Sequence, residues 1–513
     1  MKRYLLSIDV GTSMVKAILF CMDGAIAARG DRPCHLSNPK PDHYEMDLDA
    51  FYQALVETIR ECLGKSGAKP EEIAAIGISA YMTGVILLDQ EGKQVGENIV
   101  WIDSRTTPLL KAWEESGLAE QSYRLTGTAL LPGSTLPILC WWKQNRPQVL
   151  DRAKYHLFMK DWIRFRLTGE ICTDPSEATC LPSSTYERGW SEEVMALYGM
   201  KEYMHLLPPI RQPEEIVGAV HHQAALETGL KEGTPVICGL GDMLAGMLGA
   251  GALEGGQGVT ILGSTLLNSV IQDWPNAAPE GIGMTLATAG GKWARFVNNT
   301  GGGTMNSSWA MGLLAQREQG DFAAKSQYYA WLDRQIAAIA PCAEGLMYHP
   351  YINSTGVTAP FYNVGARAQF TGIGLHHTRG HLLRAVYEGM AMAIRDCYGA
   401  VPGGVGQIRI SGGGSRSPVL CQIISDICKK ELLLPREAEA TALGCAILAA
   451  CAVGEYASLE EAVGQMVGIE KRYQPDDTLS DHYDHWFDLF QKTAQTMMPL
   501  WDQRLDFMRK MNR

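Results

Sequence analysis

The alternation of apolar and polar positions near the start of the chain predicts a buried strand that ends on a carboxylate. Residues 5–10 alternate apolar residues with small or polar ones, and Asp9 stands near their end. A glycine turn, a second apolar run, an Asp-Gly turn and a third run follow. We therefore expect three strands within residues 4–29, joined by two tight turns.

The apolar periodicity further along the chain predicts alternating helices and strands. The expected helices span residues 48–64, 376–398 and 477–511. The expected strands span residues 73–79, 97–106 and 407–411. Residues 235–253 read as a strand, a glycine turn and a helix, and residues 256–271 as a second hairpin that repeats the first.

The repeated hairpin predicts a duplicated α/β architecture in which a ligand is held between the two halves. A chain of 513 residues exceeds a single hydrophobic core, so two domains are expected. We place the first domain at residues 1–252, the second at 253–455 and a helical tail at 456–513.

The first turn carries the residue types that bind phosphate and magnesium. Gly11 lets the backbone approach a ligand, Thr12 and Ser13 offer donors, and Lys16 adds a positive charge. Asp9 is a hard oxygen ligand for Mg²⁺, directly or through water. Such a turn can hold nucleotide phosphates. An ordinary hairpin at a sheet edge is the alternative.

Asp242 follows a predicted strand and two glycines, and it opens a helix of small residues. A carboxylate there can accept a hydroxyl proton during phosphoryl transfer, and the helix terminus is expected to keep it ionised. Because aspartate is also a favoured helix N-cap, the residue pattern leaves both roles open.

Three later turns combine glycine with hydroxyl residues where a strand ends. They are Gly263-Ser264-Thr265, residues 300–304 and residues 411–417. Glycines at a helix N-terminus can bind an anion or let an adenine or ribose lie flat on the backbone. Flexible loops have the same composition, so the alternative stays open.

Composition and charge exclude some classes of function. The formal net charge of −11 argues against a nucleic-acid partner. The 13 cysteines form no C-x-x-C pair, which favours free thiols in a reducing compartment. Neither a signal peptide nor a membrane span is expected. A cytoplasmic protein is the simplest interpretation, and a homodimer is left open.

Taken together and in order, several segments resemble the FGGY family of carbohydrate kinases. In the first half they are residues 8–20, 77–93, 99–106, 160–179 and 239–253. In the second half they are residues 349–396, 410–427 and 439–454. The resemblance covers residues 3–455 and implies a two-domain actin-like, ribonuclease H-like ATPase fold with an interdomain cleft.

The resemblance also implies a reaction: ATP-dependent phosphorylation of a sugar or polyol hydroxyl, with Mg²⁺. It makes Asp242 the catalytic base and places Asp9 near the metal. The residues implied for ATP and its phosphates are Thr12, Ser13, Lys16, Ser264, Gly302, Gly303, Gly413 and Ser417. The residues implied for the sugar are Tyr81, Met82, Thr83, Trp101, Asp103 and Met243.

The candidate sugar residues depart from the family pattern. Residues 81–84 resemble the Gln-Met-His-Gly of xylulokinases, with Tyr81 and Thr83 as replacements, and lack the Arg-Glu pair of glycerol kinases. Met243 stands where those relatives carry Asn or Gln. Because a site built for a hydroxyl discriminates strongly, we expect a xylulokinase-like enzyme that phosphorylates a ketose-like sugar, with a deoxy or shorter sugar also conceivable. The alternatives are a glycerol- or erythritol-type polyol kinase, an actin-like ATPase without a sugar acceptor and a non-catalytic sugar sensor.

Overall fold

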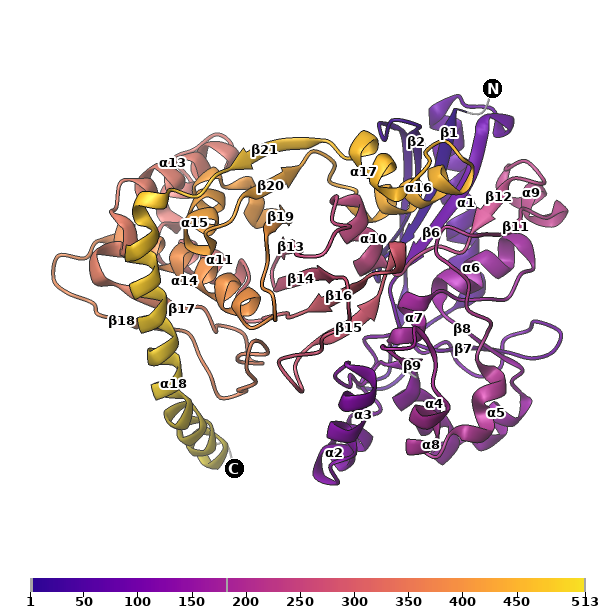
Figure 1. Cartoon of the computed structure of the whole chain (residues 1–513), viewed down its shortest axis with the longest axis horizontal. Coiled ribbons are helices and arrows are strands. Elements are labelled where there is room, and N and C mark those ends of the chain that lie inside the picture. Colours follow the sequence, from indigo (N-terminus) through magenta and orange to yellow (C-terminus); the bar gives the residue numbers. More distant parts are fainter. Residues whose placement is uncertain (1–2, 181–182, 512–513) are drawn as a thin grey trace. The chain divides into compact units, whose positions relative to one another are not determined.

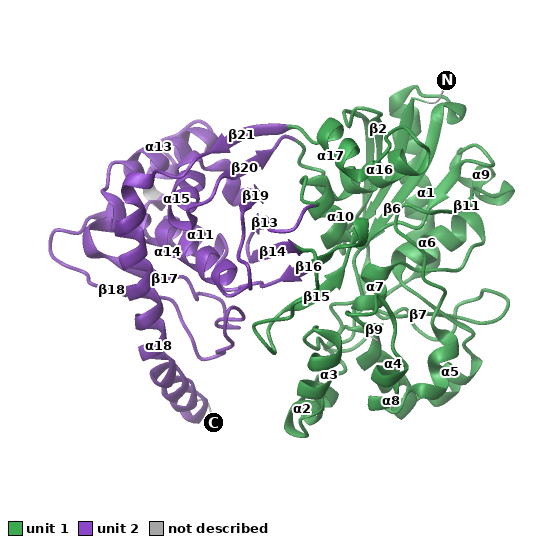
Figure 2. Ribbon diagram, viewed as in Figure 1, with its two compact units in different colours: residues 1–253, 272–294, 437–468 green, residues 254–271, 295–436, 469–513 purple. Residues whose placement is uncertain are grey.

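The chain passes back and forth between two structural units in the computed structural model, which describes residues 3–180 and 183–511. Unit 1 comprises residues 1–253, 272–294 and 437–468, and unit 2 comprises residues 254–271, 295–436 and 469–513 (Figure 2). The first break in the chain falls one residue from the expected boundary. The two later returns to unit 1 have no counterpart in a linear division of the sequence.

Unit 1 contains the N-terminal sheet and most of the helices of the first half (Figure 1). Its strands are β1 (Tyr4–Val10), β2 (Met14–Cys21), β3 (Ile26–Pro33), β4 (Leu36–Ser37), β5 (Glu45–Met46), β6 (Ile73–Ala80), β7 (Ile86–Leu88), β8 (Tyr155–Leu157), β9 (Ser183–Ser184), β10 (Gly189–Trp190), β11 (Ile216–Ala219), β12 (Pro235–Ile237) and β15 (Met284–Ala287). Its helices are α1 (Leu48–Ser66), α2 (Thr107–Glu115), α3 (Leu118–Thr126), α4 (Thr135–Asn145), α5 (Pro147–Arg152), α6 (Met159–Thr168), α7 (Pro175–Thr179), α8 (Glu192–Leu197), α9 (His222–Thr228), α10 (Asp242–Gly249), α16 (Ala440–Ala452) and α17 (Leu459–Met466).

The main sheet of unit 1 has the strand order β11-β12-β6-β1-β2-β3. The three predicted N-terminal strands are confirmed as antiparallel neighbours, and β6 joins β1 in parallel. Successive side chains of a strand point to opposite faces, so Ile8 and Ser7 face different layers. Helix α1 packs on the Ile8 face, and α16 covers the other face of β1 and β6. Burial on both faces explains why these strands read as nearly continuous apolar runs.

A second core in unit 1 lies around the β7–β8 pair and helix α4. Val85, Ile99 and Trp142 are among its buried residues. The strand expected over residues 97–106 is wrong: Ile99 makes only isolated bridges, to Glu45 and Val85, and the rest of the segment is irregular. Its apolar residues are buried by packing rather than by strand pairing.

Unit 2 is built on the second hairpin. Its strands are β13 (Gln257–Leu262), β14 (Leu266–Gln272), β17 (Met347–His349), β18 (Gln369–Thr371), β19 (Gln407–Ser411), β20 (Leu432–Pro435) and β21 (Ile469–Tyr473), and β16 (Trp293–Phe296) lies where the chain enters residues 295–436. Its helices are α11 (Met305–Leu314), α12 (Gln316–Gln319), α13 (Lys325–Ala337), α14 (Arg379–Gly399), α15 (Pro418–Cys428) and α18 (Ser480–Met511). The predicted β13–β14 hairpin is confirmed, and β19 continues the sheet in parallel beside β13.

Helix α14 is the most deeply buried helix of unit 2 and packs against α11 and α15. It begins three residues later than expected, at Arg379, because Thr378 is its extended N-cap residue. The expected C-terminal helix is confirmed as α18, which buries Tyr483, Phe490 and Trp501.

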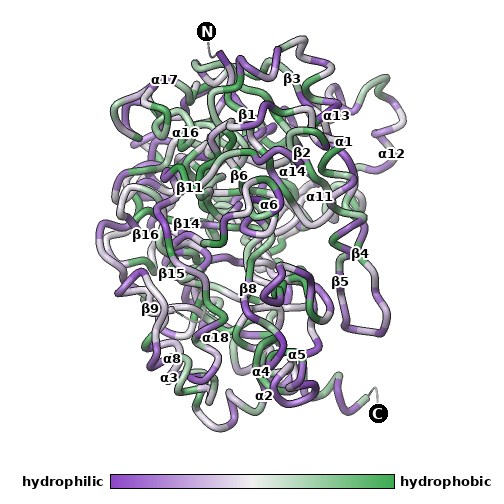
Figure 3. The backbone as a smooth tube through the Cα atoms, turned by 90° about the vertical axis from the view of Figure 1, so that its right-hand side faces the viewer, coloured by the Kyte–Doolittle hydropathy of each residue, from purple (hydrophilic) through white to green (hydrophobic). Residues whose placement is uncertain are grey.

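Hydrophilic segments follow the exposed surface. Residues 38–42, between β4 and β5, are exposed and belong to a mostly purple loop in Figure 3. Among the described residues, every helix is too short or too polar to cross a membrane.

Candidate functional site

Strand register places three polar side chains of neighbouring strands in one row. Asp9 of β1 pairs with Lys16 of β2 and with Ser79 of β6. The Ser79 hydroxyl donates to Asp9 Oδ1 over 2.9 Å. The row lies on the sheet face that α16 covers, and Asp9 is 9% exposed. The sequence-predicted turn therefore presents a fixed carboxylate at the end of the central strand.

Lys16 is held by a partner that lies far away in sequence. Its Nζ lies 2.6 Å from Glu439 Oε2, just before α16, and Arg29 Nη1 lies 2.7 Å from the other oxygen of Glu439. Thr12 and Lys16 are half-buried, and Ser13 is exposed. The hydroxyls of the turn are thus accessible, whereas the lysine is engaged in an ion pair within unit 1.

Asp242 is the first residue of α10. The N-cap residue of α10 is Gly241. Asp242 Oδ1 accepts from the backbone N–H of Met243 over 2.7 Å, and both side chains are half-buried. Asp242 thus accepts one backbone N–H of the first helical turn, so the geometry is compatible with both roles considered for it.

The surroundings of Asp242 make it a weaker acid than an exposed aspartate. Burial and the nearby charge of Asp9 raise the pKa of Asp242 to about 7, against the opposing hydrogen bond from Met243. The expectation that the helix terminus keeps this group fully ionised is thus wrong at neutral pH. Burial also raises the pKa of Asp9, although Ser79 and Lys16 oppose the shift.

Asp9 fits the requirements of a magnesium ion. Mg²⁺ in nucleotide enzymes is held by one or two carboxylates together with phosphates and waters. Among the described residues no hydrogen bond reaches Asp9 Oδ2, and the charge of Asp9 adds to the electrostatic cost of ionising Asp242. A cation relieves that cost. Clusters of three or more metal-binding side chains are not found in the described part of the chain.

The structure brings one candidate sugar residue to the phosphate turn. Trp101 is 43% exposed, and its Nε1–H donates to Thr12 Oγ1 over 2.8 Å. Tyr81 and Met82 are instead buried. A Cβ on Gly241 would lie 2.5 Å from Met82 Sδ, so Met82 packs directly against the turn that precedes Asp242.

Both carboxylate oxygens of Asp103 are occupied by hydrogen bonds within the protein. It is 1% exposed, and its Oδ1 accepts from the backbone N–H and the Nε of Arg105, both at 2.9 Å. Its Oδ2 accepts from Tyr44 N and Arg105 Nη2 at 2.7 and 2.8 Å. This geometry favours a structural role for Asp103 over the sugar contact expected from the sequence.

Thr83 has a backbone conformation that β-branched residues rarely adopt. Its φ is +68°, in the left-handed region. The Thr83 N–H donates to Glu177 Oε2 over 3.2 Å, and its side chain is half-buried. Strained residues persist where the surroundings hold them, and they gather at functional sites.

The three hydroxyl- and glycine-rich turns of unit 2 lie together. Thr304 donates from both its N and its Oγ1 to Gly263 O, each over 2.8 Å, which joins the residue 300–304 loop to the β13–β14 turn. A Cβ on Gly303 would lie 2.2 Å from Ser264 O, so only glycine permits this contact. Gly414 packs on Leu262 and approaches Thr304, which brings in the third turn.

These turns differ in what they leave accessible. Ser264 and Gly413 are exposed, whereas Gly302 and Gly303 are buried beneath the β13–β14 turn. Ser417 caps α15 by accepting from Leu420 N, and it donates to Asp333 Oδ1 over 2.7 Å. The accessible parts of these turns are therefore backbone and hydroxyl groups, which surround two buried glycines.

A cavity of about 550 Å³ lies beside these turns in unit 2. It is formed by α11, α12 and α13, with Ser308, Trp309, Gly312 and Tyr329 among its lining residues. Ser308 is one helical turn from Thr304, and Tyr329 is one turn from Asp333. The cavity thus adjoins elements that carry candidate nucleotide groups.

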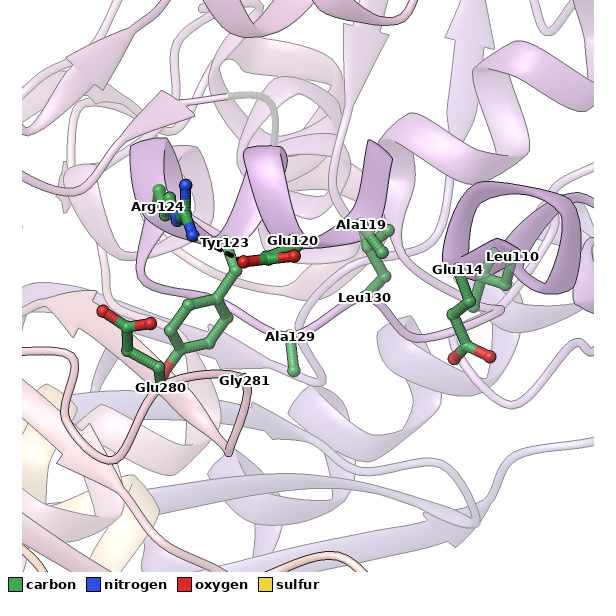
Figure 4. A pocket seen from close by; sticks show the side chains of 10 residues that line it. All are labelled: Leu110, Glu114, Ala119, Glu120, Tyr123, Arg124, Ala129, Leu130, Glu280 and Gly281. Carbon is green, nitrogen blue, oxygen red and sulfur yellow. Dashed lines mark hydrogen bonds and ion pairs between the residues drawn. The ribbon is translucent and has the colours of Figure 1, made fainter. Parts of the chain in front are cut away.

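A second cavity, of about 330 Å³, lies in unit 1 and is lined by α2, α3 and the residue 280–281 loop (Figure 4). The candidate site residues do not line it. In Figure 4 Arg124 is paired with Glu120, and Tyr123 extends toward Glu280. The Tyr123 hydroxyl donates to Ala277 O over 2.5 Å, so the ring fastens this loop rather than facing a ligand.

Sequence reasoning did not single out the residues that hold the site in place. Ser176 and Glu177 of α7 bond to the backbone near Asp242 and Thr83, and Glu439 engages Lys16. All three lie in segments that resemble the family. Their individual roles depend on contacts between residues far apart in the chain, for which spacing gives no signal.

Comparison with known proteins finds one family that matches most of the chain. The sequence profile of the N-terminal domain of the FGGY family of carbohydrate kinases matches residues 4–249, and that of the C-terminal domain matches residues 260–453. Erythritol kinase of Brucella abortus is 29% identical over 97% of this chain and 97% of its own length. Xylulose kinase of Bacillus subtilis is 29% identical over 95% of this chain and 96% of its own length.

Solved structures give the same picture of the fold. The xylulose kinase of Rhodospirillum rubrum superimposes with a TM-score of 0.87 and 25% identity over 98% of this chain and 100% of its own. The predicted two-domain α/β ATPase fold is confirmed, as is phosphoryl transfer from ATP to an alcohol group as the reaction class. The chain belongs to the FGGY family of carbohydrate kinases.

Proposed function

We propose that this carbohydrate kinase transfers the γ-phosphate of ATP to a hydroxyl of a small ketose-like sugar or polyol, with Asp242 as the general base. One observation carries this proposal. The Asp242 carboxylate stands at the start of α10, and its pKa is raised to about 7 by burial and Asp9. A base with a pKa near the working pH combines a useful basic fraction with a real affinity for the proton.

Asp9 is the residue that would hold Mg²⁺ beside the phosphates, directly or through water. The ion would neutralise the charge on the transferring phosphoryl group. Thr12 and Ser13 donate to phosphate oxygens from the β1–β2 turn. Asp242 orients the acceptor hydroxyl and takes its proton. Its main contribution is the orientation, since phosphoryl transfer depends mostly on the positioning of the reacting groups.

Unit 2 supplies the proposed nucleotide groups. Ser264 and the exposed Gly413 offer donors, with Ser417 and the buried pair Gly302 and Gly303 shaping the loops. We assign the nucleobase to the cavity beside α11 and α13. Its aromatic residues Trp309 and Tyr329 can pack against a flat ring.

The acceptor is proposed to lie at Trp101, Thr83 and Met243. Trp101 offers an exposed ring, and Thr83 offers a half-buried hydroxyl. Asp103 is left out because its oxygens are occupied by Arg105 and Tyr44. A site with so few free polar groups favours an acceptor with few hydroxyls, such as a short or deoxy sugar or a small polyol.

The direct test is ADP release from ATP and Mg²⁺ across a panel of ketoses, deoxysugars, sugar acids and polyols. The proposal predicts rapid ADP release with one acceptor class and a phosphorylated product of matching mass. Slow ATP hydrolysis that no acceptor accelerates would instead identify an ATPase. Sugar binding without any turnover would identify a sensor.

A further inference from the structure

The short helix α7, labelled in Figure 1, contacts two backbone segments of the proposed acceptor site at once. Ser176 Oγ accepts from Gly241 N over 3.0 Å, at the residue before Asp242. The next residue, Glu177, accepts from Thr83 N over 3.2 Å. Both α7 side chains are fully buried. Adjacent residues of one helix therefore fix the backbone of the acceptor loop and of the base turn.

A buried charge network holds α7 in place. Asp174 caps the helix by accepting from Ser176 N over 2.7 Å, and its other oxygen lies 2.8 Å from Lys160 Nζ. Lys160 and Arg164 also pair with Asp161 at 2.6 and 3.0 Å. All four charged side chains are 0% exposed. Removing one member of such a network leaves a buried charge unpaired, so the network resists rearrangement.

The same network reaches the strand that leads to Asp242. Arg164 Nη1 donates to Cys238 O over 2.6 Å, four residues before the base. Burial acts to lower the pKa of Lys160, but Asp161 and Asp174 outweigh it and raise that pKa. The cations therefore stay charged, and one electrostatic cluster fastens both α7 and the approach to the base turn.

The hydrogen bond between Thr83 and Glu177 stabilises a strained backbone conformation. Thr83 has a positive φ, and a hydrogen bond to its N–H helps to hold the loop there. Glu177 Oε1 has no hydrogen-bond partner among the described residues, and burial raises the pKa of Glu177 well above its usual range. Glutamine keeps the shape of this side chain, and its amide oxygen can accept from the Thr83 N–H without a buried charge.

We propose that α7 is a positioning element of the kinase, in which Glu177 sets the acceptor loop at Thr83 and Ser176 sets the turn that carries Asp242. The inference rests on the proposed function, since it assigns acceptor binding to Thr83 and the base to Asp242. Neither α7 residue is a catalytic residue. Each acts on the substrate through the backbone of another segment.

Steady-state kinetics separate the two effects. Glu177→Leu raises the KM for the acceptor about 10-fold and leaves kcat within about threefold, the pattern of lost binding. Glu177→Gln retains near-wild-type values because its amide oxygen accepts from Thr83 N. Ser176→Ala lowers kcat about 10-fold with little change in either KM, since it loosens the base turn.

Matched variants control for loss of packing. Thr58→Ala removes another fully buried hydroxyl of unit 1, and Glu388→Leu removes a buried glutamate of unit 2. Both should lower thermal stability, and neither should change one of KM and kcat while leaving the other unchanged. The positioning role is overturned when Glu177→Leu and Ser176→Ala each change kcat and KM to a similar extent, which is the pattern expected of the control variants. It is also overturned when Glu177→Gln is no more active than Glu177→Leu.

Amide hydrogen exchange tests the two contacts without any activity. Glu177→Leu should speed exchange at Thr83 and spare Gly241, whereas Ser176→Ala should do the reverse. If the protein phosphorylates no acceptor in the panel, the proposed function is wrong. Amide hydrogen exchange then still shows whether α7 holds the two backbone segments. Unchanged exchange in an active enzyme sinks the α7 inference alone.

Discussion

Trp101 donates its indole N–H to Thr12 Oγ1 over 2.8 Å, which joins a proposed acceptor residue to the proposed phosphate turn within unit 1. Trp101→Phe keeps the aromatic face and removes this bond. We expect the acceptor KM to rise about 2- to 10-fold, the effect of one exposed hydrogen bond. The KM for ATP should change less.

Trp274→Phe is the matched control for this prediction. Trp274 is 79% exposed and stacks on Trp293, away from the site residues. An equal rise in acceptor KM in both variants would contradict a specific role for Trp101.

The pH dependence of catalysis follows from the pKa of Asp242, which is about 7 in the folded protein. The base must be ionised to take a proton, so kcat/KM should rise with pH and level off above about 7, falling about tenfold per unit below it. Initial rates between pH 5 and 9 measure this. A flat profile across that range would exclude Asp242 as the titrating base.

The stability of the protein should also depend on the ionisation of Asp242, but it should fall as the pH rises, whereas activity should increase. The pKa of Asp242 is raised from an ordinary value of 3.8, so the folded state binds the proton more tightly than the unfolded state. The free energy of unfolding therefore falls as pH rises from about 4 to about 7. Asp242→Asn removes this loss and should stabilise the protein by about 1–3 kcal/mol at pH 8, less than the full shift because the side chain is half-buried.

Thermal unfolding at pH 5 and pH 8 tests this prediction, with Asp47→Asn as the control. Asp47 caps α1 and is exposed, so its amide variant should lower stability slightly at both pH values. Equal effects of Asp242→Asn at the two pH values would show that the carboxylate is not destabilised by its surroundings.

The nucleobase assignment predicts a selective loss of ATP affinity. Gly312 lines the unit 2 cavity, and a Cβ there meets open space. Gly312→Leu should raise helix propensity by about 0.5–1 kcal/mol and fill the cavity. We expect the KM for ATP to rise about 10-fold or more and the acceptor KM to stay unchanged.

Gly464→Leu is the control for the cavity variant. Gly464 lies in α17 and its Cβ position is also open. A normal KM for ATP in Gly312→Leu, with the protein folded, would place the nucleobase elsewhere.

The sequence predicted those features that depend on local pattern. The alternation over residues 5–10 and the glycine turn led to β1, β2 and Asp9, and the repeated pattern over residues 256–271 led to β13 and β14. Strands buried on both faces and tight turns leave a clear signal because each is set by neighbouring residues.

Features that depend on distant partners left no such signal. Lys16 looked free for phosphate, but Glu439 lies 423 positions away and pairs with it. Asp103 looked like a sugar ligand until folding placed Arg105 and Tyr44 on its two oxygens. The positive φ of Thr83 runs against the preference of a β-branched residue and is held by Glu177.

The turnover of Asp242→Asn tests the central claim most directly. The amide keeps the shape of the side chain but cannot take a proton, so kcat should fall about 10²- to 10⁴-fold, the usual contribution of a positioned base. ATP and acceptor should still bind to the folded variant. A variant that is folded, binds both substrates and turns over at near the wild-type rate would contradict the assignment of Asp242 as the general base.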